Sequence, residues 1–505
     1  MNDDSRTMKR IAVKMIRYAV VVGVTMLLTL IVVRVVMTRN TSPLQRWHTY
    51  APDELNIAEI DRADWIGYLN AEQRVFEQVR REVVDKLPVT VKVTANRYYA
   101  GSPLYPANLS HDWNRSFILE PDGEPAGVVV LLHGLTDSPY SLRHIGQHYR
   151  DRGYVAIAIR MPAHGTVPAG LAHVRWQAWR SATRLAIREA RRRVAIDKPL
   201  HLVGYSMGAA LALDYSLDAL DDPELAPATR LVLISPMIGV REYARYADVA
   251  GWPAMLPPLA RTAWSDVLPE FNPFKYNSFT LNAARQAYLL SSRVQQRMNA
   301  QENAKRLNEL PPILCFQSVV DDTVDATAVI SALFAKLPEN DSEVVLFDVN
   351  RAVHFGPLLS VSADTTLKRM WPAGSQRYRT IIIGNPSGTA DGVIAQVIEP
   401  GDMQADTQPL PLRYPASIFS LSHIALPFPE TDSLYGSTPD SSENYGVHLG
   451  ALALRGERGV LVVNTNMLTR VSFNPFFPYM LQKIDQYIDT PEGMPLTGDR
   501  EKQQQ

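Results

Sequence analysis

The sequence predicts an α/β protein with a doubly wound, mostly parallel sheet, a helical cap insertion and an N-terminal transmembrane helix. Three observations predict this class. From residue 127 onward, short apolar runs rich in β-branched residues alternate with helical stretches, as a parallel sheet requires. The pentapeptide GYSMG at 204–208 lies between one such run and a helical stretch. Near the N-terminus, residues 18–33 form an apolar segment without a charged residue.

Length and composition limit the classes of function. The chain has 505 residues, of which 46% are hydrophobic and 20% charged, which is the composition of a globular protein. The formal net charge of −1 gives no basic field, so we expect no nucleic-acid partner. The single cysteine, Cys315, lies in an apolar run and is expected in the core. Because no Cys/His cluster has zinc spacing and no Gly-rich loop precedes Lys-Ser/Thr, we expect neither a metal nor a cofactor.

The N-terminal apolar segment predicts a membrane anchor. It is longer than the apolar core of a typical signal peptide, and no small-residue cleavage site follows it, so an uncleaved signal anchor at 18–37 is favoured. Basic residues precede the segment, and positive charge favours the cytoplasmic side. The sequence therefore predicts a single-pass membrane protein with a cytoplasmic N-terminus at 1–17 and a periplasmic or extracytoplasmic body.

Short apolar runs bounded by turn residues predict the strands, and longer runs with helical periodicity predict the helices that connect them. Strands are expected at 116–119, 127–132, 153–159, 199–203, 230–234, 312–316, 343–349, 379–385, 392–398 and 459–463. Helices are expected at 141–151, 176–194, 209–217, 326–337 and 478–488.

One long segment interrupts the alternation of strands and helices. Residues 237–310 carry many aromatic residues and prolines, followed by helical patterns. Because this segment stands between two sheet strands, we expect a cap or lid over the pentapeptide. The predicted divisions of the chain are a cytoplasmic N-terminus at 1–17, the anchor at 18–37, a helical linker at 38–95, the first core part at 96–236, the cap at 237–310, the second core part with an extra hairpin at 311–490, and a disordered tail at 491–505.

The pentapeptide has the form of a nucleophile elbow centred on Ser206. Gly204 and Gly208 stand two places on either side of the serine, where the turn is so tight that only small residues fit. Such a turn exposes the hydroxyl and starts a helix directly beneath it. A serine hydroxyl is a weak nucleophile by itself, so it needs a histidine base, an orienting acid and an oxyanion hole. In this arrangement the acid and then the base follow the serine in the chain.

Two backbone N–H groups are candidates for the oxyanion hole. The first belongs to Met207, the residue after the serine. The second belongs to Leu135, because the turn that begins at His133 ends the strand at 127–132, one strand–helix unit earlier. His133 precedes the serine and lies on this loop, so we expect it to be a structural residue rather than the base.

The orienting acid has two candidates after the strand at 312–316. Asp321 is preferred, because the apolar Val324 three residues later would dock the loop back on the sheet. Asp322 instead suits the N-terminus of a helix.

The base also has two candidates. His354 follows the strand at 343–349, and His423 follows a second strand-like segment with small neighbours that suit a tight loop. The residue pattern alone leaves both open.

The chain resembles the α/β-hydrolase-fold carboxylesterases and lipases, including the monoacylglycerol lipase and serine aminopeptidase-like group. The resemblance covers roughly residues 96–490. It is carried by HGLTDSP at 133–139, AHG at 163–165, the elbow at 204–208, and Gln317 with Asp321 and Val324. The chain looks most like a membrane-anchored bacterial branch in which the segment FSLSH, followed by LPFP, carries the base, and this resemblance implies His423. RMPAHG at 160–165 departs from the family pattern, with arginine and alanine where aspartate and glycine are frequent.

Together, the elbow and the resemblance predict a serine hydrolase that cleaves carboxylic esters through an acyl-enzyme. Ser206 would attack, His423 would carry the proton, Asp321 would orient the histidine, and the N–H groups of Leu135 and Met207 would hold the oxyanion. The aromatic residues of the cap favour a small-molecule or lipid-like ester. An amidase, peptidase or acyltransferase would use the same residues, and a non-catalytic binding protein on the same fold is a further alternative.

Overall fold

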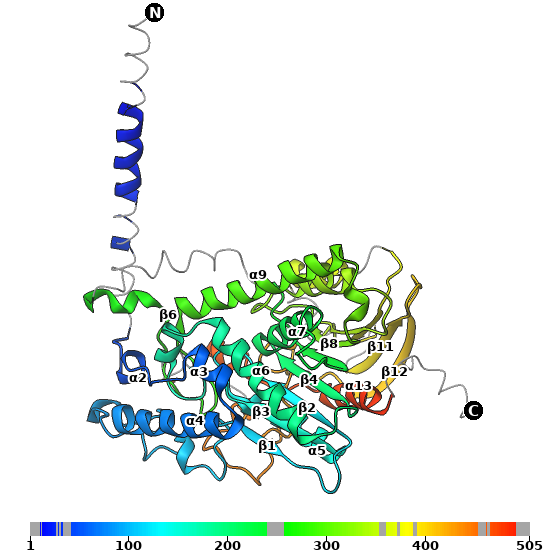
Figure 1. Cartoon of the computed structure of the whole chain (residues 1–505), viewed down its shortest axis with the longest axis horizontal. Helices are drawn as coiled ribbons and strands as arrows, with labels where there is room; N and C mark the ends of the chain where they lie inside the picture. The colour runs from blue at the N-terminus through cyan, green and yellow to red at the C-terminus, as the bar shows by residue number, and fades with distance from the viewer. Residues whose placement is uncertain are drawn as a thin grey trace, which may run out of the picture.

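The computed structural model describes residues 11, 13–26, 29, 32–33, 42–239, 257–352, 360–370, 374–386, 391–452, 461 and 465–490. A ten-stranded sheet runs through the body in the order β1-β3-β2-β4-β5-β8-β9-β10-β11-β12 (Figure 1). Its neighbours from β3 to β10 pair in parallel, whereas β1, β11 and β12 are antiparallel additions at the edges. The strands are β1 (Phe117–Leu119), β2 (Gly127–Leu132), β3 (Tyr154–Ile159), β4 (Leu200–Tyr205), β5 (Arg230–Ile234), β8 (Ile313–Ser318), β9 (Glu343–Phe347), β10 (Arg379–Gly384), β11 (Gly392–Ile398) and β12 (Asp406–Arg413).

The sheet separates two hydrophobic cores. Side chains alternate between the faces of a strand, so Val128 and Val130 of β2 join one core and Val129 and Leu131 join the other. Helices α6 (Trp176–Arg193) and α7 (Met207–Ala219) supply the first core, and α5 (Arg143–Asp151) and α13 (Phe477–Asp489) supply the second. Central strands that are apolar on both faces are therefore covered on both, as the doubly wound prediction requires.

The remaining elements are short or lie outside the sheet. The other helices are α2 (Arg46–Thr49), α3 (Ile57–Arg62), α4 (Trp65–Val79), α9 (Leu281–Asn303), α10 (Ala326–Ala328), α11 (Val361–Met370) and α12 (Thr465–Leu468), and a separate two-stranded ribbon pairs β6 (Trp264–Asp266) with β7 (Phe279–Thr280).

The predicted α/β class with a mostly parallel sheet is confirmed, and two local predictions differ from the structure. The helix expected at 326–337 is broken into α10, a π-turn at 329–333 and a 3₁₀ turn at 334–336. Strand β12 was not expected, because its sequence DTQPLPLR is polar and contains two prolines. Proline is tolerated at the edge of a sheet, where its missing N–H costs no ladder bond, and β12 is the last strand of the order. The strand expected at 459–463 lies almost wholly outside the described residues.

The predicted membrane anchor at 18–37, and with it the periplasmic or extracytoplasmic body, is contradicted. In the described part of the chain, no helix combines the length and apolar character that are needed to cross a bilayer. Residues 1–10, 12, 27–28, 30–31 and 34–41 lie outside the description, as does the tail at 491–505.

The predicted helical linker at 38–95 packs onto the body. Trp65 and Tyr68 of α4 are buried in the same core as α6, and Val75 of α4 is buried as well. Figure 1 shows α3 and α4 beside the sheet, next to α6.

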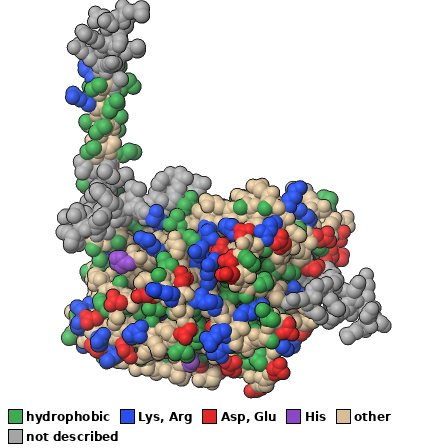
Figure 2. All heavy atoms as spheres, in the orientation of Figure 1, with side chains coloured by type: hydrophobic (Ala, Val, Ile, Leu, Met, Phe, Trp, Pro, Cys, Tyr) green, Lys and Arg blue, Asp and Glu red, His purple; other side chains and the backbone are tan. Residues whose placement is uncertain are grey.

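The predicted cap at 237–310 is described at 237–239 and from residue 257 onward, and residues 240–256 lie outside the description. Its long helix α9 packs along α7. Arg293 of α9 pairs with Asp214 and Asp218 of α7 at 2.8 and 2.7 Å. Figure 2 shows cationic and anionic side chains mixed on this face of the molecule. The assignment of the segment as a cap stays a prediction.

Candidate active site

Ser206 occupies a strained turn between β4 and α7. Its φ of 54° is positive, a conformation that costs free energy for any residue with a side chain. The Ser206 N–H donates to the carbonyl of Ile234 on β5 at 2.9 Å, and the Ser206 carbonyl accepts from the N–H of Met237 at 3.1 Å. The neighbouring strand therefore holds the turn in this conformation.

The two glycines of the pentapeptide have no room for a side chain. A Cβ on Gly208 would lie 1.8 Å from the carbonyl oxygen of Leu132, and one on Gly204 would lie 2.4 Å from the backbone of Ala209. The helix can thus begin directly beneath the serine only because both positions lack a Cβ.

The loop after β2 lies against the serine. A Cβ on Gly134 would lie 3.3 Å from the Cβ of Ser206 and 3.1 Å from the ring of Tyr205. Among the described residues, the N–H groups of Leu135 and Met207 donate no hydrogen bond. The loop that carries Leu135 thus approaches Ser206 at Gly134, while Met207 follows Ser206 directly in the chain.

His133 supports this loop from inside the protein. Its Nε2 accepts from the N–H of Met161 at 3.0 Å, so Nδ1 carries the proton and donates to the carbonyl of Gly134 at 2.9 Å. Burial lowers the pKa of His133 to about 3. The imidazole is therefore neutral at ordinary pH, and both its nitrogens are used in holding the loop.

Asp321 and His423 lie together, although 102 residues separate them. His423 Nδ1 donates to Asp321 Oδ2 at 2.7 Å, and the Asp321 side chain is fully buried. The other carboxylate oxygen accepts from the N–H groups of Thr323 and Val324 at 2.8 and 3.1 Å. Asp322, the alternative acid, is exposed.

The environment of Asp321 favours its ionised form. Burial by itself would raise the pKa of this carboxyl, but the adjacent His423 and the backbone donors of Val324 and Thr323 hold the pKa below its usual value. A carboxylate in this state fixes the tautomer of His423 with the proton on Nδ1, and leaves Nε2 as an acceptor.

The loop that carries His423 is held by residues that sequence reasoning missed. Ser318, at the end of β8, donates through Oγ to the carbonyl of Leu421 at 2.7 Å. Asn350, just after β9, donates its backbone N–H to the carbonyl of Phe419 at 2.9 Å. The hydroxyl of Tyr205 donates to the carbonyl of His423 itself at 3.2 Å. Serine and asparagine at strand ends are too common for their sequence positions to have shown this role.

The alternative base, His354, lies in a part of the chain that the structure does not describe. His354 falls within 353–359, outside the described residues. In the described part of the chain, Asp321 has His423 as its histidine partner.

A lysine beside the loop that carries Leu135 was also not predicted. Lys275 Nζ donates to Thr136 Oγ1 at 3.1 Å, and the Tyr276 N–H donates to the Thr136 carbonyl at 2.8 Å. Burial lowers the pKa of Lys275, an effect that Asp137 opposes, and burial raises the pKa of Asp137, an effect that Lys275 opposes. The segment before β7 thereby packs a cation against the loop that carries Leu135.

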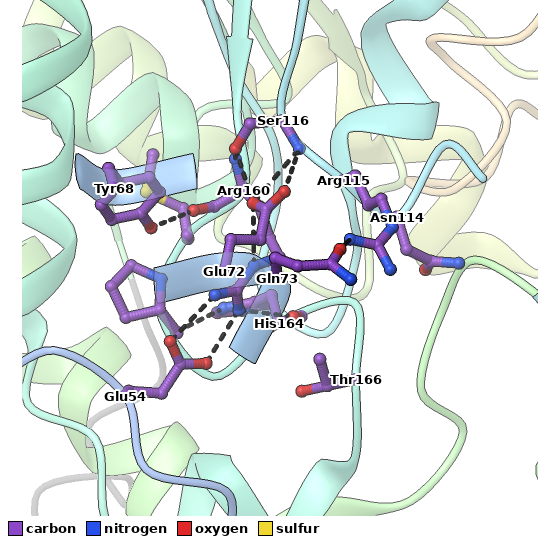
Figure 3. A network of polar contacts seen from close by, with 12 residues as sticks. Glu54, Tyr68, Glu72, Gln73, Asn114, Arg115, Ser116, Arg160, His164 and Thr166 are labelled. Atoms are coloured by element: carbon purple, nitrogen blue, oxygen red, sulfur yellow. Dashed lines mark hydrogen bonds and ion pairs between the residues drawn. The ribbon is translucent and has the colours of Figure 1, made fainter. Parts of the chain in front are cut away.

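The loop at 160–165 is fixed by the N-terminal segment. Arg160 donates to both carboxylate oxygens of Glu54 at 2.8 and 2.9 Å and to Glu72 at 3.1 Å, as Figure 3 shows. Arg160 and Glu72 are 1% and 3% exposed, so this is a buried ion pair. The next residue, Met161, supplies the N–H that His133 accepts. Arg160, the arginine that departs from the family pattern, thus links Glu54 and Glu72 to the segment whose Met161 bonds His133.

Among the described residues, no group of three or more histidine, cysteine, aspartate or glutamate side chains could hold a metal ion. Cys315 is buried in β8, and burial raises the pKa of its thiol.

The sheet order and the strained serine turn between a central strand and a helix define the α/β-hydrolase fold. Residues 129–369 match the model of the Alpha/beta hydrolase family. This segment includes the elbow, the loop of Leu135 and Asp321, and it ends before His423.

Comparison with known proteins finds lipase and esterase relatives. The chain is 26% identical to Phospholipase YtpA of Bacillus subtilis over 118 residues, which cover 23% of this chain and 43% of that protein. It is 26% identical to the thermostable monoacylglycerol lipase of Bacillus sp. over 144 residues, which cover 28% of this chain and 56% of that protein. The chain thus spans about half the length of the curated relatives it matches. A solved structure, a soluble variant of monoglyceride lipase from Saccharomyces cerevisiae, is 14% identical with a TM-score of 0.34, over 46% of this chain and 81% of that one.

Proposed function

We propose that the protein is a serine hydrolase that cleaves carboxylic esters through an acyl-enzyme. One observation carries the proposal: the 2.7 Å hydrogen bond between His423 and the buried Asp321, on a loop that Tyr205 ties to the nucleophile elbow. An ionised acid, a histidine with a free Nε2 and a strained serine are the parts that nucleophilic acyl transfer requires.

The reaction proceeds in two halves. Ser206 Oγ attacks the ester carbonyl while His423 Nε2 takes the hydroxyl proton, and the N–H groups of Leu135 and Met207 bind the oxyanion. Collapse of the tetrahedral species breaks the ester C–O bond, and His423 returns the proton to the departing alcohol. Water, deprotonated by His423, then attacks the acyl-enzyme and releases the carboxylic acid and the free serine.

The names of the curated relatives bear on the substrate class. The curated relatives carry the names of a phospholipase and a monoacylglycerol lipase, which favours a lipid-like ester. Amides, peptides and acyl transfer to another alcohol use the same residues, so substrate choice is a matter for experiment.

A series of p-nitrophenyl esters of increasing acyl length, assayed beside the matching p-nitroanilides, tests the proposal. We expect ester turnover that Ser206→Ala and His423→Ala each abolish, with little turnover of the anilides. Faster anilide cleavage would identify an amidase instead. A folded wild-type protein that turns over neither series would favour the non-catalytic alternative.

A further inference from the structure

The peptide bond between Gly134 and Leu135 is held in one orientation by the His133 ring. The Gly134 carbonyl oxygen accepts from His133 Nδ1 at 2.9 Å and from the Asp137 N–H at 3.3 Å. The C=O and N–H of a trans peptide point in opposite directions, so the Leu135 N–H lies on the edge of the peptide away from the bound oxygen. In the described part of the chain, this N–H donates to no acceptor. Fixing the carbonyl therefore fixes where the Leu135 N–H points.

The tautomer of His133 is set by a backbone N–H of the loop after β3. The Met161 N–H donates to His133 Nε2 at 3.0 Å, so this nitrogen carries no proton. The ring is neutral at ordinary pH, since burial lowers its pKa to about 3. Its one ring proton then lies on Nδ1, where it donates to the Gly134 carbonyl. The orientation of the Gly134–Leu135 peptide therefore depends on where Met161 is placed.

Met161 begins a tight turn that contains a strained residue. The His164 N–H donates to the Met161 carbonyl at 3.1 Å and closes the turn. Ala163, inside the turn, has a φ of 69°, a conformation that costs free energy for a residue with a side chain. Such a turn keeps its shape only where neighbouring groups hold it.

Glu54, from the segment before α3, holds this turn at two points. Its carboxylate accepts from both terminal nitrogens of Arg160 at 2.8 and 2.9 Å, a pair that Figure 3 shows, and from the Ala163 N–H at 2.8 Å. Arg160 in turn donates to the His164 carbonyl at 3.0 Å. Hydrogen bonds to an ionised group are stronger than those between neutral groups. One carboxylate thus binds the residue before Met161 and the strained residue after it.

We propose that Glu54 is a positioning residue for the oxyanion hole. It acts through the turn at 161–164 and His133, and so sets the direction of the Leu135 N–H. The inference rests on the proposed function, in which this N–H binds the oxyanion. It connects the N-terminal segment, which lies outside the residues 129–369 that match the hydrolase family, to the chemistry of the site. Because donors stabilise an oxyanion only when they already point at it, loss of Glu54 should slow the chemical step more than it weakens substrate binding.

Glu54→Gln in the full chain tests the proposal, with Asp53→Asn as the matched control. Glutamine keeps the size of the side chain but cannot accept from Arg160 at both of its terminal atoms. Asp53 is exposed, and in the described part of the chain it forms no ion pair with Arg160. Rates on a p-nitrophenyl ester are divided by the fraction of Ser206 that a fluorophosphonate labels at completion. We expect Glu54→Gln to lower kcat about tenfold with KM within about twofold, and Asp53→Asn to change neither.

Inhibition by a trifluoromethyl ketone distinguishes positioning from a purely structural role. Ser206 Oγ adds to the ketone carbon, the hydroxyl proton passes to His423, and the ketone oxygen becomes the oxyanion. The inhibition constant should therefore rise about tenfold in Glu54→Gln and stay unchanged in Asp53→Asn. A purely structural Glu54 would lower the urea midpoint, yet leave kcat per labelled serine and the inhibition constant at their wild-type values.

A second variant keeps the test decisive if Glu54→Gln does not fold. Glu54→Asp keeps the charge but is one methylene shorter, so it reaches Arg160 and the Ala163 N–H less well, and it should lower kcat about threefold. Wild-type kcat and a wild-type inhibition constant in either folded variant would overturn this inference alone. A folded wild-type protein that neither turns over esters nor takes up the label would overturn the proposed function, and this inference with it.

Discussion

The ring of Tyr205 lies 5.3 Å from the ring of His423, and its hydroxyl donates to the carbonyl of His423. Tyr205 is also the last residue of β4, directly before Ser206. One side chain thus connects the proposed nucleophile turn to the loop of the proposed base, across 218 residues of sequence.

Tyr205→Phe should lower kcat for ester hydrolysis by about tenfold with little change in KM, because it removes only the hydroxyl that positions the His423 loop. Steady-state kinetics and urea unfolding measure the two effects. We expect the free energy of unfolding to fall by only about 1 kcal/mol relative to the wild type. Tyr149→Phe is the control, since it removes a buried hydroxyl bonded to His201 without touching this loop. Equal kcat in the wild type and in Tyr205→Phe would show that the Tyr205 hydroxyl does not position the His423 loop.

Asp321→Asn should lower kcat about 10⁴-fold, because an amide no longer fixes the tautomer of His423. Asp322→Asn should leave kcat within about twofold, because that side chain is exposed and is not the partner of His423. Both are measured on the same ester. The reverse order of effects would move the acid to Asp322.

Much of the fold is predictable because it is encoded locally. The apolar runs that form β2, β3, β5 and β8 carry hydrophobic side chains on both faces. These side chains are buried only in a sheet that is covered on both faces. The elbow is local as well, since Gly204, Ser206 and Gly208 form it within five residues.

The rest depends on contacts that sequence spacing does not encode. The position of His423 is set by Ser318, Asn350 and Tyr205, which are distant in the chain. Strand β12 is exposed at an edge, so no apolar alternation indicated it. The anchor prediction is contradicted because, in the part of the chain that the structure describes, no helix is long and apolar enough to cross a membrane.

Glu72→Ala should lower the free energy of unfolding by about 3–5 kcal/mol, because it leaves the buried Arg160 with only Glu54 as its anion. Urea unfolding provides the measurement. Asp151→Ala, which breaks the exposed pair with Arg150, is the matched control and should change stability by less than about 1 kcal/mol. Equal losses in the two variants would mean that the Arg160 network does not hold the N-terminal segment to the body.

Stability should fall as the pH is lowered from about 6.5 towards 3, because burial holds the pKa of His201 at about 3. Below pH 6.5 the unfolded chain binds a proton at this residue that the folded protein does not, so the free energy of unfolding drops by about 1.4 kcal/mol per pH unit. Urea unfolding at pH 5.5 and 4.5, both well below the unfolded pKa and above the folded one, measures the slope. His201→Gln should reduce the slope by this amount, and His111→Gln, at an exposed histidine, is the comparison. An unchanged slope in His201→Gln would show that His201 does not contribute in this way.

Covalent labelling with a fluorophosphonate, read by intact-protein and peptide mass spectrometry, tests whether Ser206 is a nucleophile activated by His423. We expect one adduct per chain, located on Ser206, that disappears in Ser206→Ala and forms much more slowly in His423→Ala. An adduct that persists in Ser206→Ala, or a folded wild-type protein that takes up no label, would contradict it.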